Sequence, residues 1–163
     1  MSRVPGLDAT DARILLALDD DPQASVMALA TRLGLARNTV HTRLRRLEDS
    51  GALGAHSRRV DPAALGRGLL AFITLSISQS EGDRAGEELA RIPEVVEILA
   101  VTGDGDLLAR VVARDTADLY RVTEQILQAP GVVRASTSIA LLEVQPMRIA
   151  PLLEQHAGDP RAG

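Results

Sequence analysis

The chain of 163 residues and 17.3 kDa has room for one domain of ordinary size or for two small ones. A hydrophobic share of 45% and a charged share of 25% exclude a wholly disordered chain. The absence of cysteine excludes disulfide scaffolds, thiolate metal sites and cysteine nucleophiles. The three histidines have no metal-binding helical spacing, and no signal peptide or membrane-spanning stretch is visible. We therefore expect a cytoplasmic protein without a metal or cofactor and without a membrane partner.

The net charge of −4 is distributed unevenly along the chain. Residues 1–60 contain nine arginines and seven acidic residues, whereas residues 61–163 contain nine arginines and fifteen acidic residues. Within residues 32–59, seven arginines face only Glu48 and Asp49. A basic segment followed by an acidic one favours two domains with different partners, and a solvated basic face is the alternative.

The first fifty residues show the pattern of three short helices. Asp8 and Asp11 have the spacing of a capping box, and the helix that follows ends at residues 19–22. Ser25 is an N-cap for a second helix over residues 26–33. Gly34 supplies a tight turn before a third helix over residues 37–49. This arrangement predicts a helix-turn-helix.

The third helix is amphipathic. Val40, Leu44 and Leu47 share one side of it, whereas the other side carries polar residue types that can read DNA. Arginine can bond guanine, asparagine can bond adenine, and threonine can contact phosphate or the thymine methyl group. The alternative is an ordinary helix with a polar exterior.

The remaining hundred residues predict an α+β domain. A short strand over residues 54–60 carries Arg58 and Arg59, and Asp61-Pro62 ends the first domain. The elements expected after it are strands over 69–78, 95–101, 107–113 and 132–144 and helices over 82–92 and 115–128. Their order is that of a ferredoxin-like βαββαβ sandwich. One face of such a sheet is bare, which implies a homodimer. Phe72 is the only aromatic residue in these strands, which excludes an RNA-recognition module.

The turn over residues 102–106 is the most chemically distinctive segment of this half. Its glycines allow backbone N–H groups to approach a ligand, and Asp106 can accept hydrogen bonds from an amino group. An ordinary hairpin turn is the alternative. A calcium loop is excluded because the regular ligand spacing and the terminal glutamate are missing.

Together these motifs resemble the Lrp/AsnC, or feast/famine, family of transcription regulators. The resemblance covers nearly everything from residue 7 to residue 144. Its carriers are Leu7-Asp8, Asp11, Ile14-Leu15, Leu29-Ala30, Leu33-Gly34-Leu35, Val40, Arg43 to Glu48, Gly51, Leu53, Val60-Asp61-Pro62, Leu65-Gly66, Val101-Thr102-Gly103, Asp106-Leu107-Leu108, Pro130-Gly131-Val132 and Thr137. Ala36 departs from the family, which usually has a serine cap before the third helix.

The resemblance implies a winged helix-turn-helix DNA-binding domain over residues 1–53 and a connecting strand and hinge over 54–66. It further implies a ferredoxin-like effector-binding and oligomerisation domain over 67–146, followed by a C-terminal tail over 147–163. We expect double-stranded DNA to contact Arg37, Asn38, Thr39, His41, Thr42, Arg45, Arg46, Arg58 and Arg59. We expect an amino-acid effector to contact Thr102, Gly103, Asp104, Gly105, Asp106 and Thr137. Homodimers would assemble further, into tetramers or octamers.

Two other interpretations use the same fold. A siroheme-decarboxylase-like enzyme would need histidines and arginines around a tetrapyrrole-sized pocket, but the second half holds only His156. A sensor that has lost DNA binding is disfavoured by Arg37, Arg45 and Arg46. We therefore expect a regulator and not an enzyme.

Overall fold

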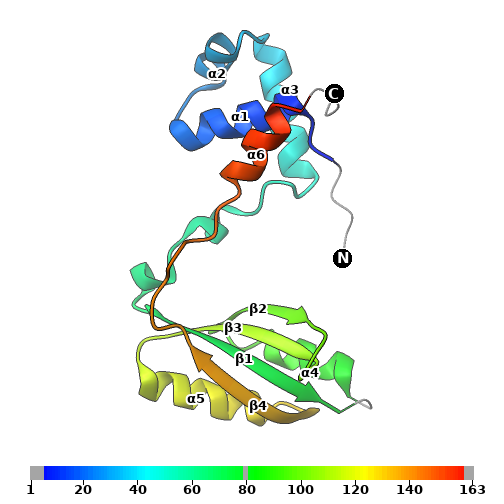
Figure 1. Ribbon diagram of the computed structural model, residues 1–163, viewed down its shortest axis with the longest axis vertical. Coiled ribbons are helices and arrows are strands. Elements are labelled where there is room, and N and C mark those ends of the chain that lie inside the picture. The colour runs from blue at the N-terminus through cyan, green and yellow to red at the C-terminus, as the bar shows by residue number, and fades with distance from the viewer. Residues whose placement is uncertain (1–5, 79–80, 160–163) are drawn as a thin grey trace. The chain divides into compact units, whose positions relative to one another are not determined.

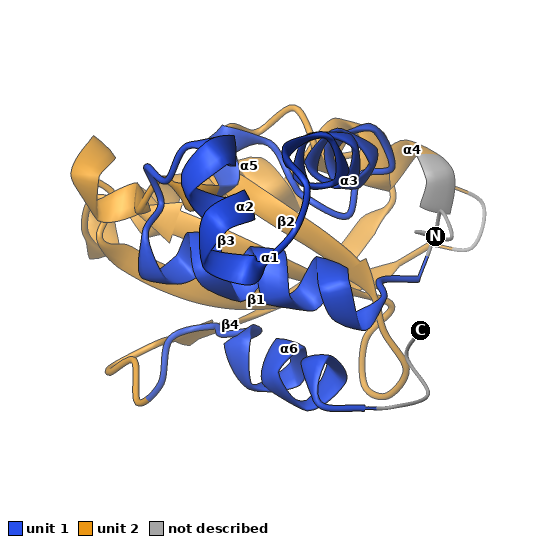
Figure 2. Ribbon diagram, turned by 90° about the horizontal axis from the view of Figure 1, so that it is seen from above, with its two compact units in different colours: residues 1–58, 145–163 blue, residues 59–144 orange. Residues whose placement is uncertain are grey.

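The computed structural model describes residues 6–78 and 81–159. The chain divides into two compact units, residues 1–58 with 145–163 and residues 59–144 (Figure 2). Residues 1–5, which belong to the segment where no signal peptide is expected, lie outside the described residues. None of the described helices is both long and apolar enough to cross a membrane.

Unit 1 is helical and contains the helix-turn-helix predicted from the sequence. Its helices are α1 (Ala9–Asp20), α2 (Val26–Leu33), α3 (Arg37–Asp49) and α6 (Ala150–Ala157) (Figure 1). The capping box at α1 and the Ser25 cap at α2 are both formed, which confirms the two predicted helix starts. Gly34 adopts the left-handed conformation that the tight turn between α2 and α3 requires, with φ 67°.

The core of unit 1 is formed where the first three helices meet. Ala17, Leu29, Ala30 and Val40 are buried together, and Leu44 packs against them. The apolar side of α3 therefore faces inward, as its periodicity predicts.

Helix α6 lies within residues 147–163, for which the sequence analysis names only a C-terminal tail and predicts no helix. It lies against α1, and its Leu153 is buried (Figure 1). His156 Nε2 lies 2.6 Å from the Leu7 carbonyl oxygen, so the last helix is bonded to the start of the first. The helical fold of unit 1 thus includes a helix that follows unit 2 in the sequence.

The segment expected as a connecting strand is helical instead. Residues His56–Arg59 form the 3₁₀ helix η1, and Pro62–Leu65 form a second one, η2, which Asp61 caps. The prediction of a strand over residues 54–60 was wrong because the segment has no neighbouring strand and closes local bonds, such as that from Arg58 N–H to the Ala55 carbonyl.

Unit 2 is the predicted ferredoxin-like sandwich. Its strands β1 (Leu69–Ile77), β2 (Val95–Ala100), β3 (Leu107–Ala113) and β4 (Val132–Ile139) pair antiparallel in the order β2-β3-β1-β4. Its helices are α4 (Gly82–Leu89) and α5 (Thr116–Leu127), which lie on one face of the sheet (Figure 1).

Two elements of unit 2 are shorter than predicted by three residues or more, whereas β1, β2 and α5 differ by only one residue at an end. Strand β4 ends at Ile139 and not at residue 144, because Ala140 already bonds Leu70 and only Leu69 of β1 remains beyond that point. Helix α4 ends at Leu89 and not at Ile92, because Pro93 disfavours helical backbone in the residue before it. Both differences lie at element ends and leave the topology unchanged.

The core of unit 2 lies between the sheet and its two helices. Ala71, Ile73 and Leu75 of β1 are fully buried there, together with Leu89 of α4 and Val122 of α5. Residues at alternate positions point to the other face, where Phe72 is 37% exposed and Leu99 is 47% exposed. The sheet therefore has one covered face and one open face within a single chain.

Candidate DNA-binding and effector-binding sites

The polar side of α3 is presented to solvent. Val40 and Leu47 are buried on its inner side, which fixes the outer side as the one that can meet a ligand. The seven α3 residues that were predicted to contact DNA are all exposed, namely Arg37, Asn38, Thr39, His41, Thr42, Arg45 and Arg46. Ala36 makes no side-chain cap, so the first-turn N–H groups of α3 receive no bond from its side chain.

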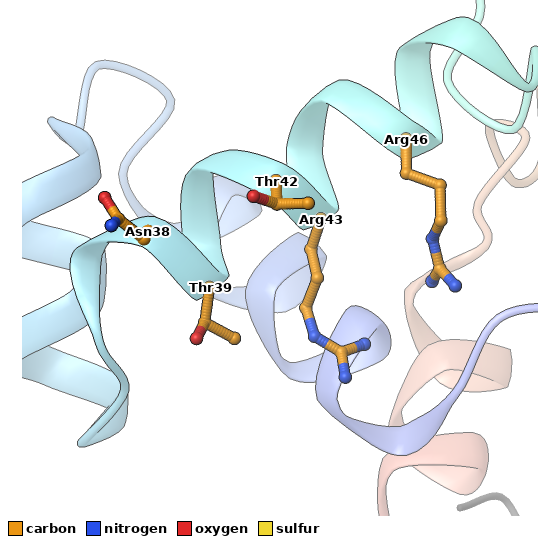
Figure 3. A pocket seen from close by; sticks show the side chains of 5 residues that line it. All are labelled: Asn38, Thr39, Thr42, Arg43 and Arg46. Carbon is orange, nitrogen blue, oxygen red and sulfur yellow. The ribbon is translucent and has the colours of Figure 1, made fainter.

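Two shallow hollows run along this surface. One is lined by Asn38, Thr39, Thr42, Arg43 and Arg46 (Figure 3). The other is lined by His41, Thr42, Arg45, Arg46, Asp49 and Ser50. Thr42 and Arg46 line both, so the predicted residues form one continuous polar surface on the helix.

A cluster of ion pairs joins α3 to the start of α1, and the sequence reasoning missed it. Arg43 bonds both Asp8 and Asp11, at 2.8 Å to Asp11 Oδ1, while Arg46 bonds Asp11 Oδ2. Burial raises the pKa of Asp8, but hydrogen bonds from Arg43 and the backbone outweigh it and leave this pKa below its usual range. The hydrogen bonds to Asp8 and Asp11 raise the pKa of Arg43. The one sign of this cluster in the sequence is the capping box, because its two acidic residues also accept hydrogen bonds from the arginines of α3.

Arg45 differs from its neighbours. It is exposed, and among the described residues it forms no ion pair with an acidic side chain. Of the arginines in the second half of α3, it is the one whose guanidinium is free to meet DNA.

Arg58 and Arg59 are exposed on η1, where the chain passes from unit 1 to unit 2. Arg58 lies in unit 1 with α3, whereas Arg59 is the first residue of unit 2.

The turn between β2 and β3 is held against the end of β1. Asp106 N–H donates to the Leu75 carbonyl at 2.8 Å, and the Asp106 carboxylate accepts from Ile77 N–H at 2.7 Å. Gly103 has φ 119°, which favours glycine. A Cβ on Gly105 would lie 2.4 Å from Thr74 Cγ2. One carboxylate oxygen of Asp106 is thus used within the chain.

The six predicted effector residues lie in two separate places, the β2–β3 turn and strand β4. The turn residues Thr102, Gly103, Asp104 and Asp106 are exposed, and Gly105 is half-buried. Thr137 is exposed on β4 and pairs with Ile73, so it lies across β1 from the turn. Within one chain the two parts flank β1.

A second ionic cluster, which the sequence analysis does not predict, lies in unit 2. The nearly buried Asp118 bonds Arg114 and Arg121, and Arg121 also bonds Glu94 at 2.8 Å. Hydrogen bonds from Arg114 and Arg121 hold the pKa of Asp118 well below its usual range. Burial raises the pKa of Glu94, but its backbone bond and Arg121 lower it more. These groups tie α5 to the residues before β2.

Two family models match separate parts of the chain. Residues 7–53 match a winged helix-turn-helix DNA-binding model, and residues 70–149 match an Lrp/AsnC ligand-binding domain model. The HTH-type transcriptional regulator AldR of Mycolicibacterium smegmatis is 35% identical over 86% of this chain and 84% of its own. The transcriptional regulator FL11 of Pyrococcus horikoshii is 34% identical over 85% of this chain and 91% of its own.

Solved structures are similar over most of the chain. Escherichia coli AsnC matches with a TM-score of 0.80 and 25% identity, covering 90% of this chain and all of its own. A transcriptional regulator of Neisseria meningitidis, solved as an L-methionine complex, matches with a TM-score of 0.76 and 27% identity, covering 90% of this chain and 99% of its own.

The fold and the exposed α3 surface define a DNA-binding transcription regulator with a separate ligand-binding domain. Since relatives more than 30% identical align over most of its length, the chain belongs to the Lrp/AsnC family of transcription regulators.

Proposed function

We propose that this regulator binds specific DNA sequences as a homodimer or a larger assembly, and that an amino acid modulates the binding. The observation that carries the proposal is the α3 surface, where polar and basic side chains are exposed while the opposite side is buried. A helix of this kind fits the major groove.

In this proposal the residues on α3 divide by role. Asn38, Thr42 and Arg45 face the bases, and Arg37, Thr39 and His41 contact bases or phosphates. Arg58 and Arg59 contact the flanking backbone. Arg46 differs from these residues because its guanidinium is bonded to Asp11. A dimer with two such helices would select half-sites about one helical turn apart.

The open sheet face supports assembly from copies of this chain. Phe72 and Leu99 are exposed on it, and Glu97 of β2 is in register with Arg110 of β3. After β4, Leu141 and Val144 expose at least nine tenths of their surface. Apolar side chains in such numbers favour burial against a second copy.

The β2–β3 turn supports an amino-acid effector. Asp106 keeps one carboxylate oxygen beyond its bond to Ile77, and this oxygen can accept from an ammonium group. A structural neighbour was solved with L-methionine, which makes methionine the first amino acid to test. Since the turn and Thr137 flank β1 in one chain, the proposed site is completed between copies.

The proposed activity is not enzymatic. The rival decarboxylase interpretation requires histidines near a large pocket in the second half of the chain. His156, the one histidine there, lies in unit 1 and contacts the Leu7 carbonyl. The relatives found are named as transcription regulators.

The test is selection of bound fragments from genomic DNA by the full-length protein, repeated with each of the twenty amino acids. We expect a pseudo-palindromic sequence to be enriched and one or more amino acids to change its affinity. Equal recovery of all sequences would refute specific binding. Unchanged affinity with every amino acid would refute the effector but not the DNA-binding role.

A further inference from the structure

Helix α3 carries two kinds of arginine. Arg43 and Arg46 are bonded to acids of α1, whereas Arg45 forms no ion pair with any acidic side chain among the described residues. Arg43 is 27% exposed and Arg46 is 50% exposed. The two paired arginines are three positions apart, so they leave the helix on the same side (Figure 3).

The acid that both arginines share is Asp11, whose side chain is fully buried. It accepts from Asp8 N–H at 3.0 Å, from Arg43 Nη1 at 2.8 Å and from Arg46 Nη2. A buried carboxylate is stable only when it is paired and its oxygens are bonded. The position of Asp11 therefore requires both arginines to stay where they are.

This arrangement sets the rotation of α3 about its own axis. Val40 and Leu47 bury one side of α3, but apolar contacts are not directional and tolerate small rotations of a helix. Charge-assisted hydrogen bonds from arginine are directional, and two of them one turn apart allow one orientation. Because Asp11 belongs to the first turn of α1, it fixes α3 relative to α1.

We propose that Asp11 is a positioning residue for DNA recognition, and that Arg46 acts on DNA through Asp11 and not by contacting a phosphate. This inference rests on the proposed DNA-binding role of α3. It replaces the expectation that Arg46 contacts DNA. Arg45 is then the arginine in the second half of α3 that contacts the bases directly. With Asp11 neutralised, α3 keeps its sequence but loses its fixed orientation toward the bases.

The first part of the test needs no DNA. Asp11→Asn, Arg46→Gln and their double variant are compared by urea unfolding, with Arg45→Gln as a control that removes the same charge from the same helix. We expect Asp11→Asn to raise the equilibrium constant for unfolding by about a hundredfold or more. Arg46→Gln should lower the free energy of unfolding much less in the Asp11→Asn background than in the wild type. The effect of Arg45→Gln on this free energy should be the same in both backgrounds.

The second part measures binding to the enriched fragment and to a random duplex of equal length, below the unfolding temperature of each variant. The ratio of the two affinities is unaffected by the folded fraction, so it separates positioning from stability. We expect Asp11→Asn and Arg46→Gln to lower this ratio, Asp11→Asn by about tenfold, the size of one mismatched base pair. Arg45→Gln should relax selection at one base pair, whereas the other two should relax it across the site.

The salt dependence of binding separates the two roles of Arg46. A lost phosphate contact would reduce the slope of log affinity against log salt by about 1. We expect Arg46→Gln to leave this slope unchanged. A slope reduced by about 1 in Arg46→Gln, or an unchanged affinity ratio in Asp11→Asn, would overturn the inference.

Two outcomes keep the inference and the proposed function distinguishable. If the wild-type protein shows no preference between the two duplexes, the proposed function fails, and the unfolding comparison still reports whether Asp11 and Arg46 are coupled. If the wild type is selective and Arg46→Gln is equally selective, only the inference fails. Should Asp11→Asn not fold, Arg46→Gln carries the same test because its side chain is half-exposed.

Discussion

Replacing Gly105 with alanine should destabilise unit 2, because the β2–β3 turn is too close to β1 to accept a side chain. The new Cβ would lie 2.4 Å from Thr74 Cγ2 and 3.0 Å from the Leu75 carbonyl oxygen. The turn would have to move away from β1. That movement weakens the bonds from Asp106 N–H to Leu75 and from Ile77 N–H to Asp106.

The expected cost is about 2–4 kcal/mol. Overpacking alone costs about 1–3 kcal/mol, and weakening the two hydrogen bonds without breaking them adds about 1 kcal/mol in total. The matched control is Gly86→Ala in α4, where nothing lies within 4 Å of the new Cβ. A helical glycine replaced by alanine should stabilise the unit by about 0.5–1 kcal/mol.

The assay can be confined to unit 2. Tyr120, the only tyrosine, lies on α5, and the chain has no tryptophan, so tyrosine fluorescence follows the unfolding of this unit in urea. Thr74→Ser removes the methyl group that clashes and should restore part of the loss in the double variant. A Gly105→Ala protein that unfolds like the wild type would refute the argument from close approach.

Three further changes test other parts of the structure. Arg45→Ala should lower discrimination at one base pair by about 1–3 kcal/mol, measured with single-base variants of the enriched fragment. Leu153→Ala should destabilise unit 1 by about 2–3 kcal/mol, seen in amide hydrogen exchange of α1, because Leu153 of α6 is only 8% exposed. Acidification should destabilise unit 2: the folded-state pKa of Asp118 is lowered from 3.8, so its stabilisation is complete above about pH 4 and declines as the pH falls toward that lower pKa. Asp118→Asn should flatten this acid dependence.

Each of these has a control and a result that would contradict it. Unchanged selectivity in Arg45→Ala would remove Arg45 from the reading surface. Leu152, on the same helix, is 61% exposed, so Leu152→Ala should change stability by less than about 0.5 kcal/mol. Equal losses for the two leucines would mean that α6 is not docked as described. If Asp118→Asn loses stability in acid as the wild type does, protonation of Asp118 is not the cause of that loss.

The helices of unit 1 and the topology of unit 2 could be predicted because local chemistry determines them. Asp8, Ser25 and Gly34 mark helix ends through short-range bonds and a left-handed turn, and those signals are visible in sequence. The buried sides of α3 and β1 follow from periodicity. Element ends were less predictable, because the end of β4 depends on where β1 starts.

The ionic clusters and α6 could not be predicted, because they depend on contacts between distant residues. Asp11 reads as half of a capping box, and only the fold shows that residues 32 and 35 positions later bond it. The docking of α6 depends on the burial of Leu153 and on the contact of His156 with the Leu7 carbonyl, which lies 149 positions earlier in the sequence. Tertiary contacts also determine which arginines in the second half of α3 form ion pairs with α1 and its cap, and the sequence does not show these contacts.

The docking of α6 on α1 has a consequence for synthesis of the protein. Domains generally fold as units while the chain emerges from the ribosome, and α1, α2 and α3 precede unit 2 in the sequence. Helix α6 follows unit 2. All residues of unit 2 are therefore synthesised before α6 can pack on α1 and bury Leu153.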